Sequence, residues 1–260
     1  MIELWRHRRW IWDSALSDLR HRYAGSGLGV FWNVVNPIIT LAVYVFIFSR
    51  VMIPRFSTAQ PSTISFPLYL IAGLLPWITF AEGLVRTTQS LLLNAVHLKK
   101  VAIPELVFVA TAVVSGTLSM LIAVALLPGL ALLLGEETTW TWLLLPVIVI
   151  IWQMFGFGVG LALSTVNVFF RDVSQILVMA LQIWMWSLPI VYFEDLLPAT
   201  YRSVLPFNPV YPFMTALRGS VMGTSPSFST WAAMLCWALV AVAAGFTVVS
   251  RLRSEIRDVL

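Results

Sequence analysis

Charge and cysteine are scarce in this chain. Only 11% of its 260 residues are Asp, Glu, Lys or Arg and 59% are hydrophobic, whereas a soluble domain carries about 25% charged residues. The uncharged runs longer than 20 residues cover 23–49, 56–81, 106–135, 138–170, 173–193 and 219–250. Each is long enough for a helix that crosses a hydrocarbon core of roughly 30 Å. Since a run such as 121–134 is apolar on every face, the pattern predicts an all-α integral membrane protein and not a barrel.

The missing residue patterns exclude several kinds of chemistry. Cys236 is the only cysteine, which excludes an intrachain disulfide and a thiolate metal cluster. The only lysines, Lys99 and Lys100, follow Leu98, so no glycine-rich ATP-binding loop ends in Gly-Lys-Ser/Thr. The glycines at 156, 158 and 160 lie in an apolar run with no preceding strand and predict close helix packing. The three histidines lie far apart without metal-ligand spacing, and the dispersed basic residues argue against nucleic-acid binding.

Charge at the ends of the hydrophobic runs predicts the topology. We place six spans at about 30–52, 66–86, 106–134, 142–167, 174–193 and 230–250. An even number leaves both termini on one side, together with twelve of the 16 Lys and Arg residues. The other four are Arg50, Arg55, Arg202 and Arg218. Because cytoplasmic loops carry the excess of Lys and Arg, both termini are predicted to be cytoplasmic.

The N-terminal segment 1–23 is too charged to span a membrane but has a helical face. This face holds Trp5, Trp12, Leu16, Leu19 and Tyr23, at spacings typical of a helix. We interpret it as an amphipathic helix in the cytoplasmic interface of the membrane. Packing on a partner subunit is the alternative, and the two are compatible.

The segment 194–229 precedes the last predicted span. Between Arg202 and Arg218 lies an uncharged stretch of 15 residues with prolines at 206, 209 and 212, too short to span and too rich in proline for one continuous helix. Irregular backbone at membrane depth needs cover from protein or water. We therefore expect short re-entrant helices at the outer mouth of a pathway.

Glu82 is the only ionisable candidate inside a span, about one turn from its cytoplasmic end. Arg86 follows four residues later, in the favourable order for a helical ion pair. An interfacial ion pair and a gate or substrate-lining carboxylate are both compatible with this position. Its depth argues against a proton- or sodium-coupling site, because such groups usually lie near the bilayer midplane.

Four blocks of sequence occur in order along nearly the whole chain. They are 18–26 (DLRHRYAGS) with 28–29, 31–32 and 36–37; 73–77 (GLLPW) with Asn94 and 98–101; 167–173 (NVFFRDV) with 182–184 and 189–192; and 205–209 (LPFNP) with 216–218. Together they resemble the permease subunits of ABC-2 type exporters of polysaccharides, the group that handles O-antigen, capsule and teichoic acid chains. Ile103 is a departure, because the family more often has Phe before the proline at 104.

This resemblance implies a homodimer with two cytoplasmic ATPase subunits, in the plasma (inner) membrane of a bacterium. ATP and Mg²⁺ would bind to the partner, and this chain would hold no cofactor or metal and catalyse no reaction itself. The cargo would be a lipid-linked polysaccharide, with O-antigen as the first choice. Contacts with the ATPase are expected in a coupling loop at 93–104 and in the turn after the fourth span, at Asn94, His97, Lys99, Lys100, Arg171 and Asp172. Positive-inside anchoring explains the two lysines equally well, and a local ion pair explains Arg171 and Asp172.

A polysaccharide path benefits from aromatic rings, because the C–H faces of sugars pack on ring faces. The candidates are Trp152, Phe169, Phe170, Trp184, Trp186, Tyr192 and Phe193. For most of them, packing or an interfacial aromatic belt is the simpler explanation.

Three alternatives remain open from the sequence. An ABC-2 permease that moves teichoic acid, capsule, lipid or a drug cannot be distinguished by the chemistry of its residues. A polytopic membrane enzyme acting on lipid-linked sugars needs a carboxylate or histidine cluster, which the chain does not supply convincingly. An ion-driven exporter predicts transport that survives the loss of ATP.

Overall fold

The computed structural model describes residues 2–22, 27, 29–47, 66–100, 103–135 and 137–259. Every element in this part of the chain is a helix, which confirms the predicted all-α class. The α-helices are α1 (Ile2–Arg6), α2 (Arg8–His21), α3 (Trp32–Ile47), α5 (Phe66–Leu93), α6 (Ala95–Lys100), α7 (Glu105–Leu133), α8 (Leu145–Phe169), α9 (Val173–Ser187), α10 (Ala199–Arg202), α11 (Tyr211–Val221) and α12 (Phe228–Val259). Short 3₁₀ helices are η1 (Gly29–Phe31), η3 (Trp140–Leu144), η4 (Glu194–Leu196) and η5 (Leu205–Phe207).

Some predicted features lie outside the described residues. They are residues 23–26 and 28 of the first family block, the end of the first predicted span with Arg50, the loop residue Arg55, and positions 101–102 of the coupling loop.

Four helices are long and apolar enough to cross a membrane. They cover Pro67–Leu93, Glu105–Leu133, Trp140–Phe169 and Phe228–Arg253, and each overlaps one predicted span to within one residue or contains it. The helices α5 and α12 extend beyond the predicted boundaries, to Leu93 and Val259, because polar and charged residues continue each helix outside its apolar run.

The predicted count of six full-length spans is not confirmed. The helices α3, with 16 residues, and α9, with 15 residues, are apolar but shorter than the other four. The span predicted at 174–193 ends as a helix at Ser187, because Pro189 follows and disfavours helical backbone at Leu188. Leu188 has the extended dihedrals φ −105° and ψ 145°.

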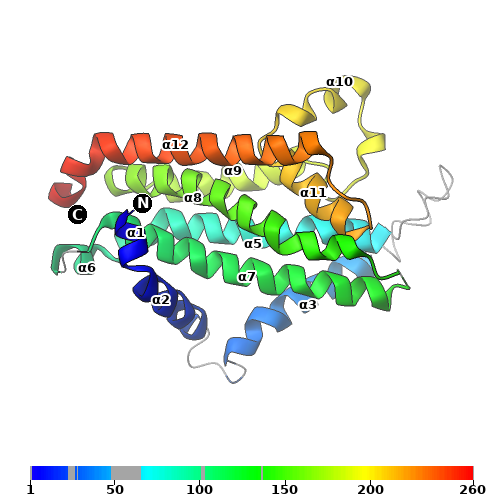
Figure 1. The fold of residues 1–260 in the computed structure, drawn as a ribbon, viewed down its shortest axis with the longest axis horizontal. Coiled ribbons are helices and arrows are strands. Elements are labelled where there is room, and N and C mark those ends of the chain that lie inside the picture. Colours follow the sequence, from blue (N-terminus) through cyan, green and yellow to red (C-terminus); the bar gives the residue numbers. More distant parts are fainter. Residues whose placement is uncertain are drawn as a thin grey trace.

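The long helices run side by side along one axis, as Figure 1 shows. Both ends of the chain lie at one end of this bundle, together with α6. We call this the terminal end. At the opposite end lie α10 and α11, and we call it the α11 end.

Glycines allow the central helices to approach closely. A Cβ added to Gly158 on α8 would overlap the backbone of Ala241 and Val242 on α12, and one added to Gly245 would overlap the backbone of Gly158. On the α5 side of α8, a Cβ added to Gly160 would overlap the side chain of Thr87. The prediction that this glycine run packs helices is therefore confirmed, with two faces of α8 in use.

Aromatic side chains fill the middle of the bundle. Trp152 is fully buried on α8, with its ring 5.4 Å from that of Phe80 and 5.7 Å from that of Phe213. Phe155 also contacts the ring of Phe213 at 5.5 Å. The core thus joins α5, α8 and α11, so α11 is an integral part of the bundle.

The N-terminal helices contact α7 through a face that shares only Leu19 with the predicted aromatic face. Ile11, Ala15 and Leu19 are buried, whereas Trp5 and Trp12 are 71% and 50% exposed. Small and branched side chains form the protein contact, and the tryptophans face outward, the arrangement that an interfacial helix requires.

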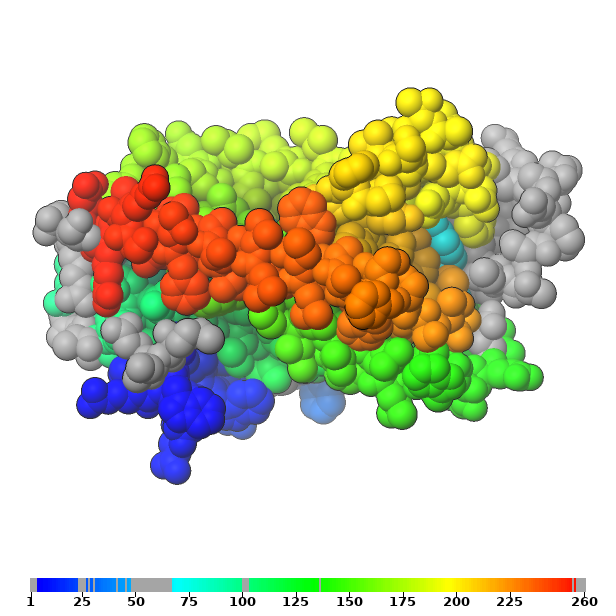
Figure 2. Space-filling model, turned by 45° about the horizontal axis from the view of Figure 1, so that its top comes forward, coloured from blue at the N-terminus to red at the C-terminus, as the bar shows by residue number. Residues whose placement is uncertain are grey.

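The segment between α9 and α12 contains the short helices predicted before the last span. The part around α10 stands out from the bundle (Figures 1 and 2). By contrast, α11 is mostly buried, and both Pro212 and Phe213 lie within its packed face.

Candidate functional site

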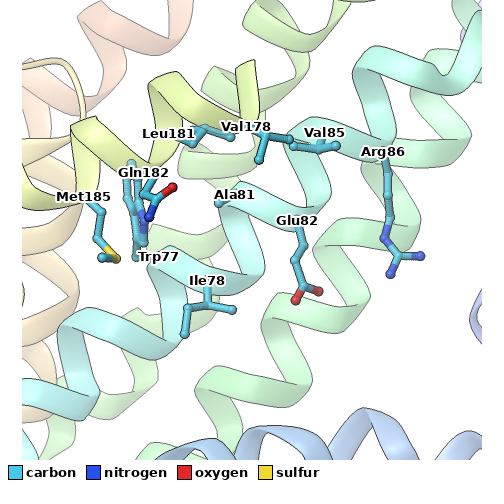
Figure 3. A pocket seen from close by; sticks show the side chains of 10 residues that line it. All are labelled: Trp77, Ile78, Ala81, Glu82, Val85, Arg86, Val178, Leu181, Gln182 and Met185. Atoms are coloured by element: carbon cyan, nitrogen blue, oxygen red, sulfur yellow. The ribbon is translucent and has the colours of Figure 1, made fainter. Parts of the chain in front are cut away.

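An open groove runs between α5 and α9. Its volume is about 460 Å³, and Figure 3 shows its lining. The residues that line it are Trp77, Ile78, Ala81, Glu82, Val85, Arg86, Val178, Leu181, Gln182 and Met185. Most of this surface is apolar, so the few polar groups in it are the candidates for orienting a ligand.

Glu82 and Arg86 project from successive turns of α5 along this groove (Figure 3). Glu82 is exposed and Arg86 is half-buried. Among the described residues, no ion pair joins their charged groups, although the spacing favours one. Both side chains instead line the groove, and the side chain of Gln182 lies at another point along it, next to Trp77 (Figure 3).

Glu82 also borders a small polar cavity on the other side of α5. This cavity has a volume of about 50 Å³, enough for water. The other residues that line it are Arg22, Asn33, Asn36, Pro37, Thr40, Leu75, Ile78, Thr79 and Ser119. Glu82 therefore lies between the groove and a polar contact of α2, α3, α5 and α7.

A hydrogen-bond network connects α2 to α7 at this cavity. Arg22 pairs with Asp18 at 3.1 Å and donates to the hydroxyls of Ser115 and Ser119, the latter at 2.8 Å. Ser115 in turn donates to Asp18. The partners are more than 90 positions apart, so sequence spacing carries no signal for this network.

The predicted aromatic residues separate into three places. Trp152 lies in the core, whereas Phe169 and Phe170 lie at the end of α8, with Phe170 68% exposed. The remaining four cluster around the C-terminal end of α9, and they are Trp184, Trp186, Tyr192 and Phe193. This cluster adjoins the groove, because the ring of Trp184 lies 6.0 Å from that of Trp77.

Hydrogen bonds hold the aromatic cluster in place. The indole N–H of Trp184 donates to the Oδ1 atom of Asn208 at 3.0 Å, and the hydroxyl of Tyr192 donates to the carbonyl oxygen of Trp186 at 2.9 Å. Burial raises the pKa of Tyr192, so this hydroxyl keeps its proton. Trp186 is 58% exposed, and its ring is available for contact.

The predicted coupling residues lie at the terminal end of the bundle. The short helix α6 is anchored by the buried Leu98, whereas His97 and Lys99 are exposed. Asn94 is half-buried and donates to the carbonyl oxygen of Ser90 at 2.8 Å. Lys100 closes the helix. This arrangement presents polar side chains on a fixed backbone.

Arg171 and Asp172 form the turn between α8 and α9, and both are exposed. The described residues contain no ion pair between them. Asn167 fixes the turn, because its Oδ1 atom accepts from the amide of Ser174 at 3.1 Å and its Nδ2 atom donates to the carbonyl oxygen of Thr88 at 3.2 Å. The turn is therefore tied to α5.

Two further charged residues were not predicted as site residues, although Arg218 was counted as an outer charge and lies in the fourth sequence block. Glu105, at the start of α7, is buried and pairs with Arg253 of α12 at 3.6 Å. Arg218 is buried in α11. Of the two, only Glu105 has a local signal, an acidic residue directly after a proline at a helix start.

Metal ligands do not gather anywhere in the described part of the chain. No group of three or more His, Cys, Asp or Glu side chains there is arranged to hold an ion.

Comparison with known proteins supplies a family match. Residues 15–222 match the family described as ABC-2 type transporter. The matched region extends from α2 to the end of α11 and thus contains the groove, the aromatic cluster and α6.

Similar proteins come from two bacteria. Two proteins of Klebsiella pneumoniae named "O-antigen export system permease protein RfbA" are each 26% identical over 247 residues, which cover 94% of this chain and 92% of theirs. A protein of Myxococcus xanthus with the same name is 30% identical over 218 residues, covering 83% of this chain and 81% of its own length.

Proposed function

The chain belongs to the ABC-2 type transporter family, and from this membership we propose that it is the permease subunit of an ATP-driven exporter of a lipid-linked polysaccharide. O-antigen is the first-choice cargo. The observation that carries this proposal is the similarity, over 94% of the chain, to proteins named as O-antigen export permeases. The chain is a transport subunit of a membrane protein family, and its long apolar helices are those of a multi-pass protein.

The proposed complex contains two copies of this chain and two copies of a cytoplasmic ABC ATPase, in the inner membrane. Family membership supports the ATPase partner. ATP and Mg²⁺ bind to that partner. The terminal end of the bundle, with its excess of Lys and Arg, faces the cytoplasm, and the α11 end faces outward.

The proposed coupling surface is α6 together with the Arg171–Asp172 turn. Both lie at the terminal end and present exposed polar side chains. The single helix α5 continues from the groove to Leu93, directly before α6. Since Arg86 is seven residues from Leu93, about 10 Å along the helix, a displacement of α6 is transmitted to the groove by a rigid element. A conformational change of the ATPase can alter the groove only if the ATPase contacts α6 differently in its two states.

The proposed path for the polysaccharide follows the groove and the aromatic cluster. Sugar C–H faces pack on ring faces, and hydroxyl groups need hydrogen-bonding partners. Trp186 offers an exposed ring, while Glu82, Arg86 and Gln182 offer polar groups. Two facing copies would enclose this surface. Trp152 is buried in the core, and we leave it out of the proposed path.

The decisive experiment purifies the tagged chain from its native host in mild detergent and identifies copurifying proteins by mass spectrometry. We expect an ABC ATPase in a ratio of 2:2. Deletion of the gene should cause a lipid-linked glycan to accumulate in the cytoplasm, and its composition identifies the cargo. A preparation that lacks any ATPase, even after crosslinking in the membrane, would contradict the proposal and favour the membrane enzyme.

A further inference from the structure

Arg218 carries a charge that the transport proposal does not use. It lies on α11, with only 7% of its surface exposed. In the described part of the chain, no carboxylate lies within salt-bridge distance of its guanidinium. A charge removed from water needs strong compensating contacts, so the surroundings of this side chain indicate what it holds.

The guanidinium contacts the backbone that follows α9. Its Nη2 atom donates to the carbonyl oxygen of Pro189 at 2.9 Å and lies 3.5 Å from that of Ile190. Its Cζ atom lies 3.7 Å from the ring centroid of Tyr69 on α5, a cation–π contact. Arg218 thus connects α11 and α5 to the loop that follows α9.

Tyr69 binds the same loop next to Arg218. Its hydroxyl lies 3.3 Å from the carbonyl oxygen of Pro189 and 3.2 Å from that of Tyr192, and its ring contacts that of Phe193 at 4.6 Å. Gly73, one turn further along α5, leaves the space for the guanidinium, because a Cβ there would overlap the Nη2 atom of Arg218.

Other bonds fix α11 and the far side of the loop. Near the end of α11, the hydroxyl of Thr141 donates to the carbonyl oxygen of Ser220 at 2.6 Å, and Trp142 donates to that of Val221 at 3.1 Å. At its start, the hydroxyl of Tyr211 donates to Glu194 at 2.9 Å. Burial is the main cause that raises the pKa of Tyr211, and the bond to Glu194 raises it further. The hydroxyl therefore keeps its proton and remains a donor. The loop 188–194 therefore lies on a rigid support.

We propose that Arg218, Tyr69 and the carbonyl groups of residues 189, 190 and 192 form a latch that closes the α11 end of the transport path. The inference rests on the proposed function. Met185, which lines the groove, lies three residues before Leu188, so the loop 188–194 is where the groove ends along α9. Because the guanidinium of Arg218 binds backbone carbonyl groups and no carboxylate of the described residues, the loop 188–194 can move away from α11 by breaking hydrogen bonds, without separating an ion pair. Export requires this release, and Arg218 is a positioning residue for it.

The test measures the accessibility of Ile190, which is fully buried. The reporter is Ile190→Cys in a Cys236→Ser background, in the purified complex with its ATPase, labelled by a hydrophilic maleimide. Without nucleotide, labelling should be slow, and Arg218→Lys should accelerate it at least fivefold, because lysine keeps the charge but loses the planar fork of donors. During ATP-driven export, the reporter in the otherwise unchanged chain should also become labelled. Equal rates with and without Arg218→Lys, or no change during turnover, would overturn the proposal.

Two controls separate the latch from general damage. Arg202→Lys alters an exposed arginine of the same segment, paired with Asp195 at 3.7 Å, and should leave the labelling rate unchanged. A second reporter, Ala238→Cys, probes a buried position on α12 and should stay protected in every variant. If Arg218→Lys does not fold, Tyr69→Phe removes only the hydroxyl and should accelerate labelling of the Ile190→Cys reporter. A wild-type rate in that variant would count against the latch. The labelling rates without nucleotide do not depend on which cargo is exported, so they test the latch alone. Failure of the transport proposal would show itself differently, as a purified permease without an ATPase.

Discussion

The contact between α8 and α12 should not tolerate a single added methyl group. In Gly158→Ala, the new Cβ would overlap the backbone of Ala241 and Val242, and backbone atoms of a helix cannot move aside as a flexible side chain does. Overpacking costs about 1–3 kcal/mol, and alanine regains up to about 1 kcal/mol of helix propensity. We expect a net loss of about 1–2 kcal/mol, since the helices themselves must separate.

The matched control is Gly129→Ala on α7. Apart from the neighbouring backbone of α7 itself, no described atom lies within 4 Å of the position that its Cβ would occupy, so only the gain in helix propensity remains. At about 2–4 °C per kcal/mol for a chain of this size, Gly158→Ala should lower the melting temperature by about 2–8 °C, whereas Gly129→Ala should leave it unchanged or raise it. Size-exclusion chromatography after heating, at a fixed heating rate, measures both. Equal stability of the two variants would refute the packing argument.

Three other predictions concern the coupling surface, the aromatic cluster and the N-terminal helix. Replacement of Lys99 and Lys100 by Glu should reduce stimulated ATPase activity while folded permease stays in the membrane; unchanged coupling would remove both lysines from the coupling surface. Trp184→Ala and Tyr192→Ala should each slow export of the glycan in proteoliposomes without dissociating the complex, and wild-type export rates in both would exclude them from the path. Ser115→Ala removes the hydroxyl that bonds to both Arg22 and Asp18 and leaves the bond from Arg22 to Ser119; we expect a loss of about 1–2 kcal/mol, seen as faster proteolysis of the N-terminal helix, and an unchanged rate would show that the Ser115 hydroxyl does not hold this helix in place.

The predictable part of the fold is the part that depends on local sequence. The long apolar runs gave the positions of four helices because hydrophobicity over about 20 residues is a local property. The glycines at 156–160 indicated close packing for the same reason. The predicted end of the fifth span at residue 193 was wrong. The uncharged run continues to Phe193, but the helix α9 ends at Ser187 because Pro189 restricts the backbone of the residue before it.

The site was less predictable because its contacts join distant positions. Arg218 was interpreted as an outer charge and as part of the fourth sequence block, although its guanidinium meets carbonyl groups 28 and 29 positions away. The sequence supports Trp152 and Trp186 equally as residues of the path. In the structure, however, Trp152 is fully buried and Trp186 is 58% exposed. Helical periodicity cannot separate them, since a membrane helix is apolar on both its protein face and its lipid face.

The short helix beside the groove has a consequence for the surrounding bilayer. With 15 residues, α9 measures about 22 Å, roughly three quarters of a typical hydrocarbon core. Lipid that meets a hydrophobic segment this short adapts by local thinning. The hydrocarbon layer beside α9 is therefore thinner than in the surrounding bilayer, and if the proposed path follows the groove, a hydrophilic chain would cross a shorter apolar distance there.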